Sequence, residues 1–367
     1  MQQTHATAQF ELSLYSAAAA LQVRAPTTAK ITRRTLSGRE DWQVAKANEQ
    51  NLLADIGATN ARFALAERDV LGPIEWLSVV DFSTPEAAIK TFLGRRDRPS
   101  ISEAILAVAG PVEADHCVLT NCGWVIDGPA IAAALDIPQV RIINDFEATA
   151  FSLPHLSLAD LATLGKGRPV RGAPMAVLGP GSGFGVACLV PGARGPIAVA
   201  TEGGHATLSG TLPREDAVID RLRQRFEHVS IERVLSGNGL ENLYYAIAAT
   251  DGIAAPGRNA AQITTAALEG TCPSSRAALD MFCSILGGVS GDLALTFGAR
   301  GGIYIAGGIA PRIVTYLTKS DFRARFEAKG RLRNYLEAIP THIICHTDAA
   351  FIGMQSLLGR RAASQGA

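Results

Sequence analysis

The chain has 367 residues, of which 47% are hydrophobic and 19% are charged, and its formal net charge is zero. This length suggests two globular domains with an ample core. A neutral chain offers no electrostatic case for a nucleic-acid partner or an anionic membrane surface, and no apolar run reaches the ~18 residues that suggest a membrane span.

The six cysteines are scattered, with no CxxC pair and no metal-ligand spacing. Free thiols in a reducing cytosol are the simplest interpretation, so we expect a cytoplasmic protein without a zinc site.

Residues 1–50 differ in composition from the rest. Up to Gly38 one acidic residue, Glu11, stands among four basic ones, with many Ala, Ser and Thr. No charged region precedes the apolar patch at 17–21, which disfavours a secretory signal. An organellar transit peptide has this kind of composition, and so does a disordered tail. We expect a disordered N-terminal extension, or a translation start placed too far upstream.

From residue 51 to the middle of the chain, apolar runs alternate with helical spacing. The predicted elements are strands at 52–57, 62–67, 74–80 and 104–109, a helix over 84–93 capped by Ser83 or Thr84, short extended pieces at 117–120 and 124–126, a helix ending at 135, and a strand over 140–143. This alternation is typical of an α/β fold.

Residues 160–174 are rich in Gly and Pro and suggest a linker. A second strand–turn–strand follows, with strands at 175–178 and 184–190 around a glycine-rich turn. It resembles the opening hairpin at 52–67, so we interpret the pair as a weak internal duplication that suggests two related α/β halves. The remaining predictions are a strand at 197–201, a helix at 215–226, helical sequence from 236 to 297, a strand at 302–306, a helix at 311, a strand at 342–345 and a helix from 348 to 358.

Asn144 and Asp145 stand where the strand at 140–143 runs into a helix. Strand ends in α/β sheets open onto the ligand crevice, and a rigid strand fixes the direction of a carboxylate there. The structural alternative is an Asx helix cap. Two glycine-rich hairpins and an acidic Gly-Gly-His segment elsewhere favour the functional interpretation.

The turns at 57–60 and 179–183 lack the helix that a Walker A loop or a Rossmann fingerprint requires. Glycines there allow positive φ and bring backbone N–H groups close to an anion, and Thr59 or Ser182 adds a hydroxyl. A plain hairpin would need glycine for geometry alone. Asp55, just before the first turn, is placed to hold Mg²⁺ through water, unless turn amides satisfy it.

Glu202-Gly203-Gly204-His205 places a carboxylate and an imidazole side by side, which suits a polyhydroxyl ligand. Glu232 could add a second carboxylate, although a solvated residue ahead of a cap at Ser236 is the plainer interpretation. The bare backbone of Gly307-Gly308 could accept a purine ring. Taken alone, that pair is better explained by close strand–helix packing.

Six motifs in this order resemble the bacterial glucokinase family of the hexokinase/actin-like ATPase superfamily, over residues 51–359. They are DIGATNAR at 55–62, NDFEA at 144–148, GPGSGFG at 179–185, EGGH at 202–205, ERVLSG at 232–237 and AGGI at 306–309. The resemblance implies a two-domain α/β fold of the actin-like ATPase (ribonuclease H-like) type with an active-site cleft between the domains. The small domain would span 51–150 and receive the C-terminal helix 348–360, and the large domain would span 151–347.

The resemblance further implies ATP-dependent phosphorylation of glucose to glucose 6-phosphate, feeding glycolysis, with ATP and Mg²⁺ as cofactors and a homodimer as in many family members. Asp145 would be the general base on the 6-hydroxyl. The sugar's other hydroxyls would be bound by Asn144, Glu202, His205, Glu232 and Asn121. ATP would be held by a first phosphate loop of Asp55, Ile56, Gly57, Ala58, Thr59 and Asn60, by a second loop of Gly181, Ser182 and Gly183, and at adenosine by Gly307 and Gly308.

The chain departs from the family pattern at three positions. Ala58 stands where the first loop usually has Gly, which would cost about 1 kcal/mol if the position needs positive φ. Ala114 stands where a Gly is common ahead of Asp115. Ser182 replaces the usual Thr and keeps the hydroxyl.

Two alternatives stay open: a kinase for another hexose, such as fructose or an amino sugar, and a non-catalytic sugar or nucleotide sensor on the same fold. Asn144 and Asp145 disfavour the sensor, because a binding protein needs no base. A DNA-binding regulator would need a helix-turn-helix, and the first 50 residues show no such pattern. The segment 202–205 disfavours an actin-like chaperone or filament, which needs no sugar pocket.

Overall fold

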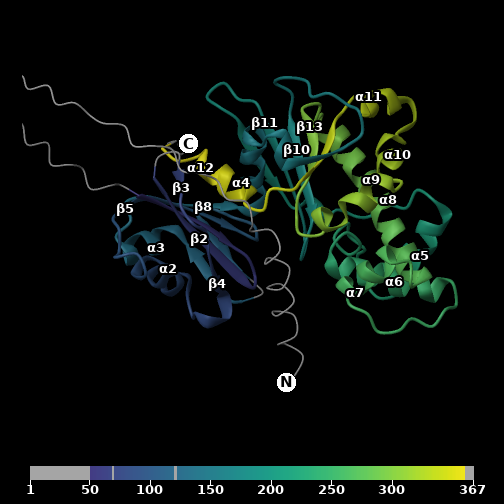
Figure 1. The fold of residues 1–367 in the computed structure, drawn as a ribbon, viewed down its shortest axis with the longest axis horizontal. Helices are drawn as coiled ribbons and strands as arrows, with labels where there is room; N and C mark the ends of the chain where they lie inside the picture. The colour runs from purple at the N-terminus through teal and green to yellow at the C-terminus, as the bar shows by residue number, and fades with distance from the viewer. Residues whose placement is uncertain (1–49, 68–69, 120–121, 360–367) are drawn as a thin grey trace, which may run out of the picture. The chain divides into compact units, whose positions relative to one another are not determined.

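The computed structural model describes residues 50–67, 70–119 and 122–359, so the expectations for Asn121 and for nearly all of the N-terminal extension lie outside the described residues. The described residues form two six-stranded sheets, a two-stranded sheet and the helices around them (Figure 1). The chain therefore has the mixed α/β fold that the alternating pattern predicts.

The first sheet has the strand order β3-β2-β1-β5-β8, with β4 also paired to β2. Its strands are β1 (Gln50–Ile56), β2 (Asn60–Glu67), β3 (Val70–Leu71), β4 (Glu75–Ser78), β5 (Ile101–Val108) and β8 (Val140–Asn144). β1 and β2 form an antiparallel hairpin, whereas β1, β5 and β8 run parallel. The carboxyl ends of these three parallel strands therefore meet at one edge of the sheet.

The second sheet repeats this pattern in the order β12-β11-β10-β13-β14-β9. Its strands are β12 (Ile197–Thr201), β11 (Phe184–Val190), β10 (Met175–Pro180), β13 (Gly302–Ile305), β14 (Thr341–Ile344) and β9 (Leu161–Leu164). An antiparallel hairpin, β10–β11, again adjoins parallel strands, β13 and β14. This recurrence agrees with the internal duplication that the two hairpins suggest.

Two helices and the small β6–β7 sheet pack into the core on one face of the first sheet. The helices are α2 (Pro85–Gly94) and α3 (Gly128–Leu135), and the small sheet pairs β6 (His116–Val118) with β7 (Val125–Asp127). Thr84 caps α2, as one of the two residues predicted for that role. Asp127 caps α3 by accepting a hydrogen bond from the Ala130 amide at 2.8 Å.

A second core joins both sheets through α4 (Asp145–Ser152) and α12 (Ala349–Gln355), which lie side by side in Figure 1. It combines Leu53 and Ile105 of the first sheet with Val177 of the second, and it includes Phe351 of α12. The segment after Asp145 is therefore packed against both sheets.

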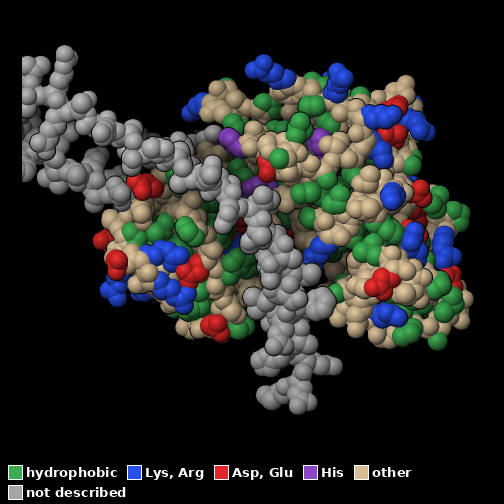
Figure 2. Space-filling view, in the orientation of Figure 1, with side chains coloured by type: hydrophobic (Ala, Val, Ile, Leu, Met, Phe, Trp, Pro, Cys, Tyr) green, Lys and Arg blue, Asp and Glu red, His purple; other side chains and the backbone are tan. Residues whose placement is uncertain are grey.

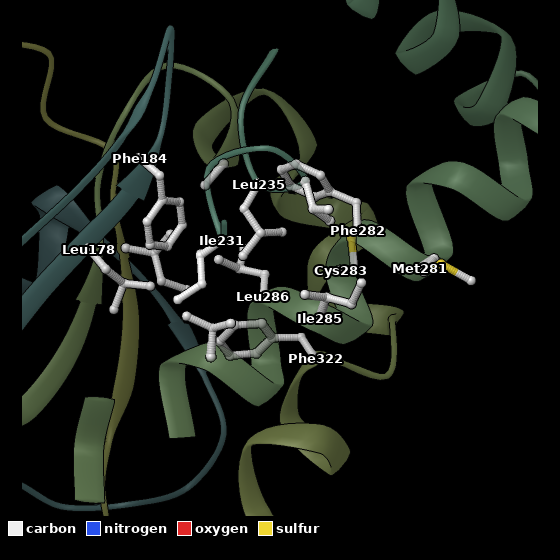
Figure 3. Packing of buried hydrophobic residues seen from close by; sticks show 14 of the residues in the cluster. Leu178, Phe184, Ile231, Leu235, Met281, Phe282, Cys283, Ile285, Leu286 and Phe322 are labelled. Atoms are coloured by element: carbon white, nitrogen blue, oxygen red, sulfur yellow. The ribbon is translucent and has the colours of Figure 1, made fainter. Parts of the chain in front are cut away.

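The largest core lies between the second sheet and the C-terminal helices. Leu178 and Phe184 from the sheet face Leu235, Leu286 and Phe322, as Figure 3 shows. The helices of this region are α5 (Pro213–Arg223), α6 (Gly237–Thr250), α7 (Ala260–Leu268), α8 (Pro273–Phe297), α9 (Val314–Lys319), α10 (Phe322–Glu327) and α11 (Arg333–Glu337). By length and composition α8 could cross a membrane, but it is mostly buried in this core, as in soluble proteins.

Some predicted elements differ from the structure. Residues 161–164 of the predicted linker form β9, an edge strand antiparallel to β14. The strand predicted at 74–80 ends at Ser78 and continues as the 3-10 turn Val79–Asp81. The helix at Pro311 begins as the 3-10 segment Ala310–Ile313 before α9. These short elements carry too little periodicity to be recognised locally.

On the face seen in Figure 2, the acidic and basic side chains of the described residues are interspersed rather than gathered by sign. This distribution accords with the zero formal net charge of the chain.

Of the two positions where alanine stands in place of the family's glycine, Ala114 has the positive φ that strains an alanine, and Ala58 does not. Among the described residues, φ is positive at Ala114 (49°) and Asp115 (58°), and Ala58 has no positive φ. Glu113 and His116 flank this pair and exchange two backbone hydrogen bonds of 3.0 Å. A two-residue hairpin turn with both central φ values positive is of type I′, which favours glycine.

We expect Ala114→Gly to raise the free energy of unfolding by about 1 kcal/mol, because glycine adopts positive φ without the steric cost of a Cβ atom. Ala58→Gly is the matched control. Ala58 has no positive φ, so glycine there relieves no strain and only increases the conformational entropy of the unfolded chain. We therefore expect the free energy of unfolding of Ala58→Gly to fall by up to about 1 kcal/mol. Urea unfolding of both variants measures the difference. Two changes of the same sign would contradict the role assigned to the Ala114 backbone.

Candidate active site

Asn144 and Asp145 lie at the carboxyl end of β8, where α4 begins. Asn144 is the N-cap: its Oδ1 accepts hydrogen bonds from the amides of Phe146 (2.9 Å) and Glu147 (3.2 Å). Its Nδ2 donates to the Gly110 carbonyl at 3.1 Å. The capping interpretation is therefore correct for Asn144, and the same bonds hold the amide rigid at the edge of the sheet.

Asp55 lies at the same edge as Asp145. Asp55 pairs with Ala107 of β5, whose neighbour Val108 pairs with Asn144. Since β1, β5 and β8 are parallel, both carboxylates stand at the carboxyl ends of their strands, with one strand between them.

Burial, together with the negative charges of Asp55 and, more weakly, Glu202, raises the pKa of the Asp145 carboxyl from 3.8 to about 7. The Phe146 amide donates to its Oδ1 at 2.9 Å and opposes the shift. The carboxylates of Asp55 and Glu202, which lie far apart in the sequence, thus both influence the ionisation of Asp145. A carboxyl group with a pKa near 7 is suited to accept a proton at neutral pH.

A pocket of about 180 Å³ adjoins Asn144. It is lined by Asn144, Glu147, Glu202, Thr201, Ala200, Pro111 and Val112. Glu202 follows β12, and its Oε2 lies 3.8 Å from His205 Nε2. The side chains of Glu202 and His205 are 58% and 60% exposed, so both are accessible to a ligand. The polar side chains of this pocket, together with His205, can donate to and accept from neighbouring hydroxyl groups.

Glu232 connects the 202–205 segment to the second glycine-rich turn. Its amide donates to the Gly204 carbonyl at 2.9 Å, and its Oε2 accepts from the Phe184 amide at 2.8 Å. Ser236 caps α6, and the Gly237 amide donates to the Gly181 carbonyl at 2.9 Å. One oxygen of Glu232 therefore orders this turn.

Gly179 and Gly183 are required by close approach, whereas a Cβ atom at Gly181 would meet only the Gly308 amide nitrogen, at 4.0 Å. None of the three has a positive φ. A Cβ atom at Gly183 would lie 2.5 Å from Glu232 Oε2, and one at Gly179 would lie 2.5 Å from the Ala306 backbone. The expectation of positive φ in this turn is therefore wrong. The Ile309 amide donates to the Pro180 carbonyl at 3.3 Å, so Gly307 and Gly308 adjoin this turn.

The first glycine-rich turn joins β1 to β2. The Gly57 amide donates to the Asn60 carbonyl at 3.0 Å, and the Val79 amide donates to the Thr59 carbonyl at 2.9 Å. Thr59 is exposed and Ala58 is half-buried. The Ile56 side chain is fully buried, so only its backbone could face a ligand.

The donor set around Asp55 fits Mg²⁺ held partly by a ligand. The described part of the chain contains no group of three His, Cys, Asp or Glu side chains that could hold a metal ion. Mg²⁺ commonly takes one or two carboxylates plus phosphate oxygens and water. Asp55 is such a carboxylate, with Oδ2 bound by Arg62.

Sequence reasoning left two side chains without a role. Glu147 lines the pocket, and burial raises its pKa. Arg62 binds Asp55 through its guanidinium. Both lie inside motifs that the sequence singled out, NDFEA and DIGATNAR, but their partners become visible only in the fold.

Known proteins match nearly all of the chain beyond the extension. The sequence model of the Glucokinase family matches residues 52–361. The glucokinase of Paramagnetospirillum magneticum is 44% identical over 311 residues, which cover 84% of this chain and 97% of that protein. The crystal structure of a glucokinase from an Antarctic psychrotroph is 37% identical, covers 84% of this chain and 98% of its own, and has a TM-score of 0.77.

More distant structures share the fold alone. A ROK family glucokinase from Streptomyces griseus, solved in complex with glucose and AMPPNP, is 17% identical, with 84% of this chain and 98% of that chain covered and a TM-score of 0.57. The fold is thus that of the actin-like ATPases, as the resemblance implies. On the strength of the family match and the identity to its members, the chain belongs to the glucokinase family.

Proposed function

We propose that this chain catalyses the ATP-dependent phosphorylation of glucose to glucose 6-phosphate, with Asp145 as the general base. The observation that carries the proposal is the half-buried Asp145 carboxyl, with a pKa of about 7, at the end of β8. It stands beside a pocket whose polar side chains include Asn144 and Glu202. The glucokinase of Paramagnetospirillum magneticum and the solved glucokinase of an Antarctic psychrotroph point by their names to glucose as the acceptor.

In this proposal Asp145 accepts the proton of the sugar 6-hydroxyl as the bond to phosphorus forms. Phosphoryl transfer passes through a loose, in-line transition state, so positioning and charge stabilisation contribute most of the rate. The remaining hydroxyls are bound by Asn144, Glu202, His205 and Glu232. These contacts hold the 6-hydroxyl against Asp145. Asn121, outside the described residues, is proposed for the same role.

The phosphates of ATP lie between the two glycine-rich turns. The phosphates are bound by the backbone amides at 57–60 and 181–183 and by the hydroxyls of Thr59 and Ser182. Adenosine is bound at Gly307-Gly308. Asp55 holds Mg²⁺, which neutralises phosphate charge when bound.

The proposal includes a division into a small domain at 51–150, joined by the helix at 348–360, and a large domain at 151–347. The fold would then be of the ribonuclease H-like type, with the substrates in a cleft between the domains. Closure of the domains over sugar would expel water, which otherwise competes as acceptor and hydrolyses ATP. The enzyme would act in the cytoplasm as a homodimer.

Asp145→Asn is expected to lower kcat with glucose by about 10²- to 10⁴-fold, because the substitution removes the base and keeps the size of the side chain. ADP release is measured with glucose, fructose, mannose and N-acetylglucosamine as acceptors. The matched control is Asp127→Asn, at the cap of α3 outside the site. It should leave kcat unchanged and the stability nearly so, because Asn and Asp cap helices about equally well.

Preference for another sugar in that panel would make the chain a kinase for that hexose. Glucose binding without turnover on any acceptor would overturn the catalytic assignment and favour a sensor.

We expect kcat/KM to rise with pH and level off above about pH 7, because Asp145 acts as a base only when deprotonated and its pKa is raised to about 7. The measurement uses both substrates well below saturation and direct determination of glucose 6-phosphate. Asp55→Asn removes the nearer negative charge and should move the midpoint to lower pH, whatever it does to the plateau. A flat profile between pH 5 and 8 would exclude Asp145 as the titrating base.

Asp145→Asn is also expected to raise the free energy of unfolding at pH 8. The pKa of Asp145 is higher in the folded chain than the ordinary 3.8, so the folded state binds its proton more tightly than the unfolded state. Ionised Asp145 therefore destabilises the fold above about pH 7, and this penalty disappears as pH falls to about 4. Urea unfolding of both proteins at pH 8 and pH 4 measures it. An equal difference at both pH values would show that ionisation is not the cause.

A further inference from the structure

We propose that Arg62 is a positioning residue that fixes the carboxylate of Asp55 for Mg²⁺–nucleotide and connects it to the segment that leads into α12. The inference rests on the proposed function, because it assigns Asp55 to the nucleotide's metal ion.

Arg62 holds one oxygen of Asp55 and leaves the other free. The two residues form a cross-strand pair between β1 and β2. Nε donates to Asp55 Oδ2 at 3.0 Å, and Nη2 donates to the same oxygen. No hydrogen bond within the described part of the chain engages Oδ1. The carboxylate thus has a fixed orientation and one oxygen available to metal-bound water.

The pair is well shielded from water. The side chains of Arg62 and Asp55 are only 16% and 17% exposed. Trp76 and Phe351 flank the guanidinium, with ring centres 5.2 and 5.4 Å from its central carbon. Charge-assisted hydrogen bonds in such surroundings are stronger than the exposed ion pairs of a protein surface.

The third nitrogen of Arg62 reaches the other end of the chain. Nη1 donates to the Thr347 carbonyl at 3.1 Å and to Asp348 Oδ1 at 3.2 Å. Thr347 and Asp348 lie between β14 and α12, and α12 packs against α4, the helix that begins with Asp145. Arg62 therefore connects the strand of Asp55 to the helix pair that carries Asp145.

Removal of the Arg62 guanidinium would leave Asp55 and Asp348 with no positive charge between them. Like charges that lose their shared partner repel, and the carboxylate of Asp55 would lose its fixed orientation. Binding of Mg²⁺–nucleotide would then have to order Asp55, whereas glucose, which the proposed function places on Asn144 and Glu202, would bind as before.

The test measures binding of a non-hydrolysable ATP analogue by calorimetry, with Mg²⁺ and with EDTA. With Mg²⁺ present, Arg62→Met is expected to weaken binding about 10- to 100-fold, the cost of a misplaced binding group. With EDTA, wild type and variant should bind the analogue within about threefold, because the assigned role of Asp55 acts through the metal ion. The affinity of Arg62→Met for glucose, measured without nucleotide, should differ from that of wild type by no more than this.

Arg62→Lys should give an intermediate loss, since an ammonium group keeps the charge but cannot donate two bonds in the fork geometry of arginine. Asp348→Asn keeps the bond to Asp55 and should give a smaller loss than Arg62→Met.

Arg96→Met is the matched control. Arg96 also forms an ion pair, with Glu75 at 2.8 Å, and its guanidinium stacks on Phe92 at 3.9 Å, away from the site residues. We expect a lower melting temperature for this variant, with unchanged affinity for both ligands.

Equal losses for Arg62→Met with Mg²⁺ and with EDTA would overturn the proposal and leave Arg62 a purely structural residue. A lower melting temperature with unchanged Mg²⁺–nucleotide affinity would do the same. If wild type binds the Mg²⁺–analogue but phosphorylates no sugar, the proposed function is refuted and the role of Arg62 is not. The comparison between variants measures binding and needs no turnover.

Discussion

The arrangement of the site depends on the partly buried carboxyl of Asp145, whose ionisation is opposed by the carboxylates of Asp55 and, more weakly, Glu202. Burial and mutual repulsion both favour the neutral form of Asp145, which is why its pKa is raised to about 7. Such a cluster is costly to assemble, so the rest of the fold must hold it in place. The parallel register of β1, β5 and β8 brings Asp55 and Asp145 to one edge, where neither can move without disturbing the sheet.

The second half of the site is held by backbone contacts instead of strand register. Glu232 bonds to the Gly204 carbonyl on one side and to the Phe184 amide on the other. Glycine at 183 is needed because a side chain there would collide with Glu232 Oε2. The segments proposed for sugar and for phosphate are thus joined by one residue, through its backbone amide on one side and its carboxylate on the other. A change at Glu232 would disturb both, and its effects on the two substrates would be difficult to separate.

Local sequence predicted the parts of this fold that carry strong periodicity or a clear end signal. The hairpin at 52–67, the strand into Asn144 and the cap at Ser236 are examples. β9 was missed, because its four residues form a strand only by pairing with β14, which lies far along the chain. Resemblance to a family supplied the proposed roles of the site residues, which periodicity alone could not.

The partners of Arg62 were equally beyond local sequence, since Asp348 lies 286 positions away. The reason for glycine was also misjudged at Gly179 and Gly183, where crowding by neighbouring chain segments, and not φ, excludes a side chain. Ala58 and Ala114 show the same limit. Both stand where glycine was expected, and only the backbone angle distinguishes the strained position from the relaxed one.

The position of Asp145 relative to the second glycine-rich turn rests on its neighbour Phe146. Phe146 follows the proposed base in α4, and its ring occupies the space that a side chain at Gly185 would fill. Gly185 pairs with Gly179 beside the turn, so a ring packed there fixes the distance between α4 and the proposed phosphate-binding backbone. Asp145 thus has two constraints from different sheets: the register of β8 behind it and the packing of Phe146 ahead of it. If Asp145 is the base, as proposed, a carboxyl group held from both sides loses little freedom when the substrates bind, and positioning of this kind contributes most of the rate in phosphoryl transfer.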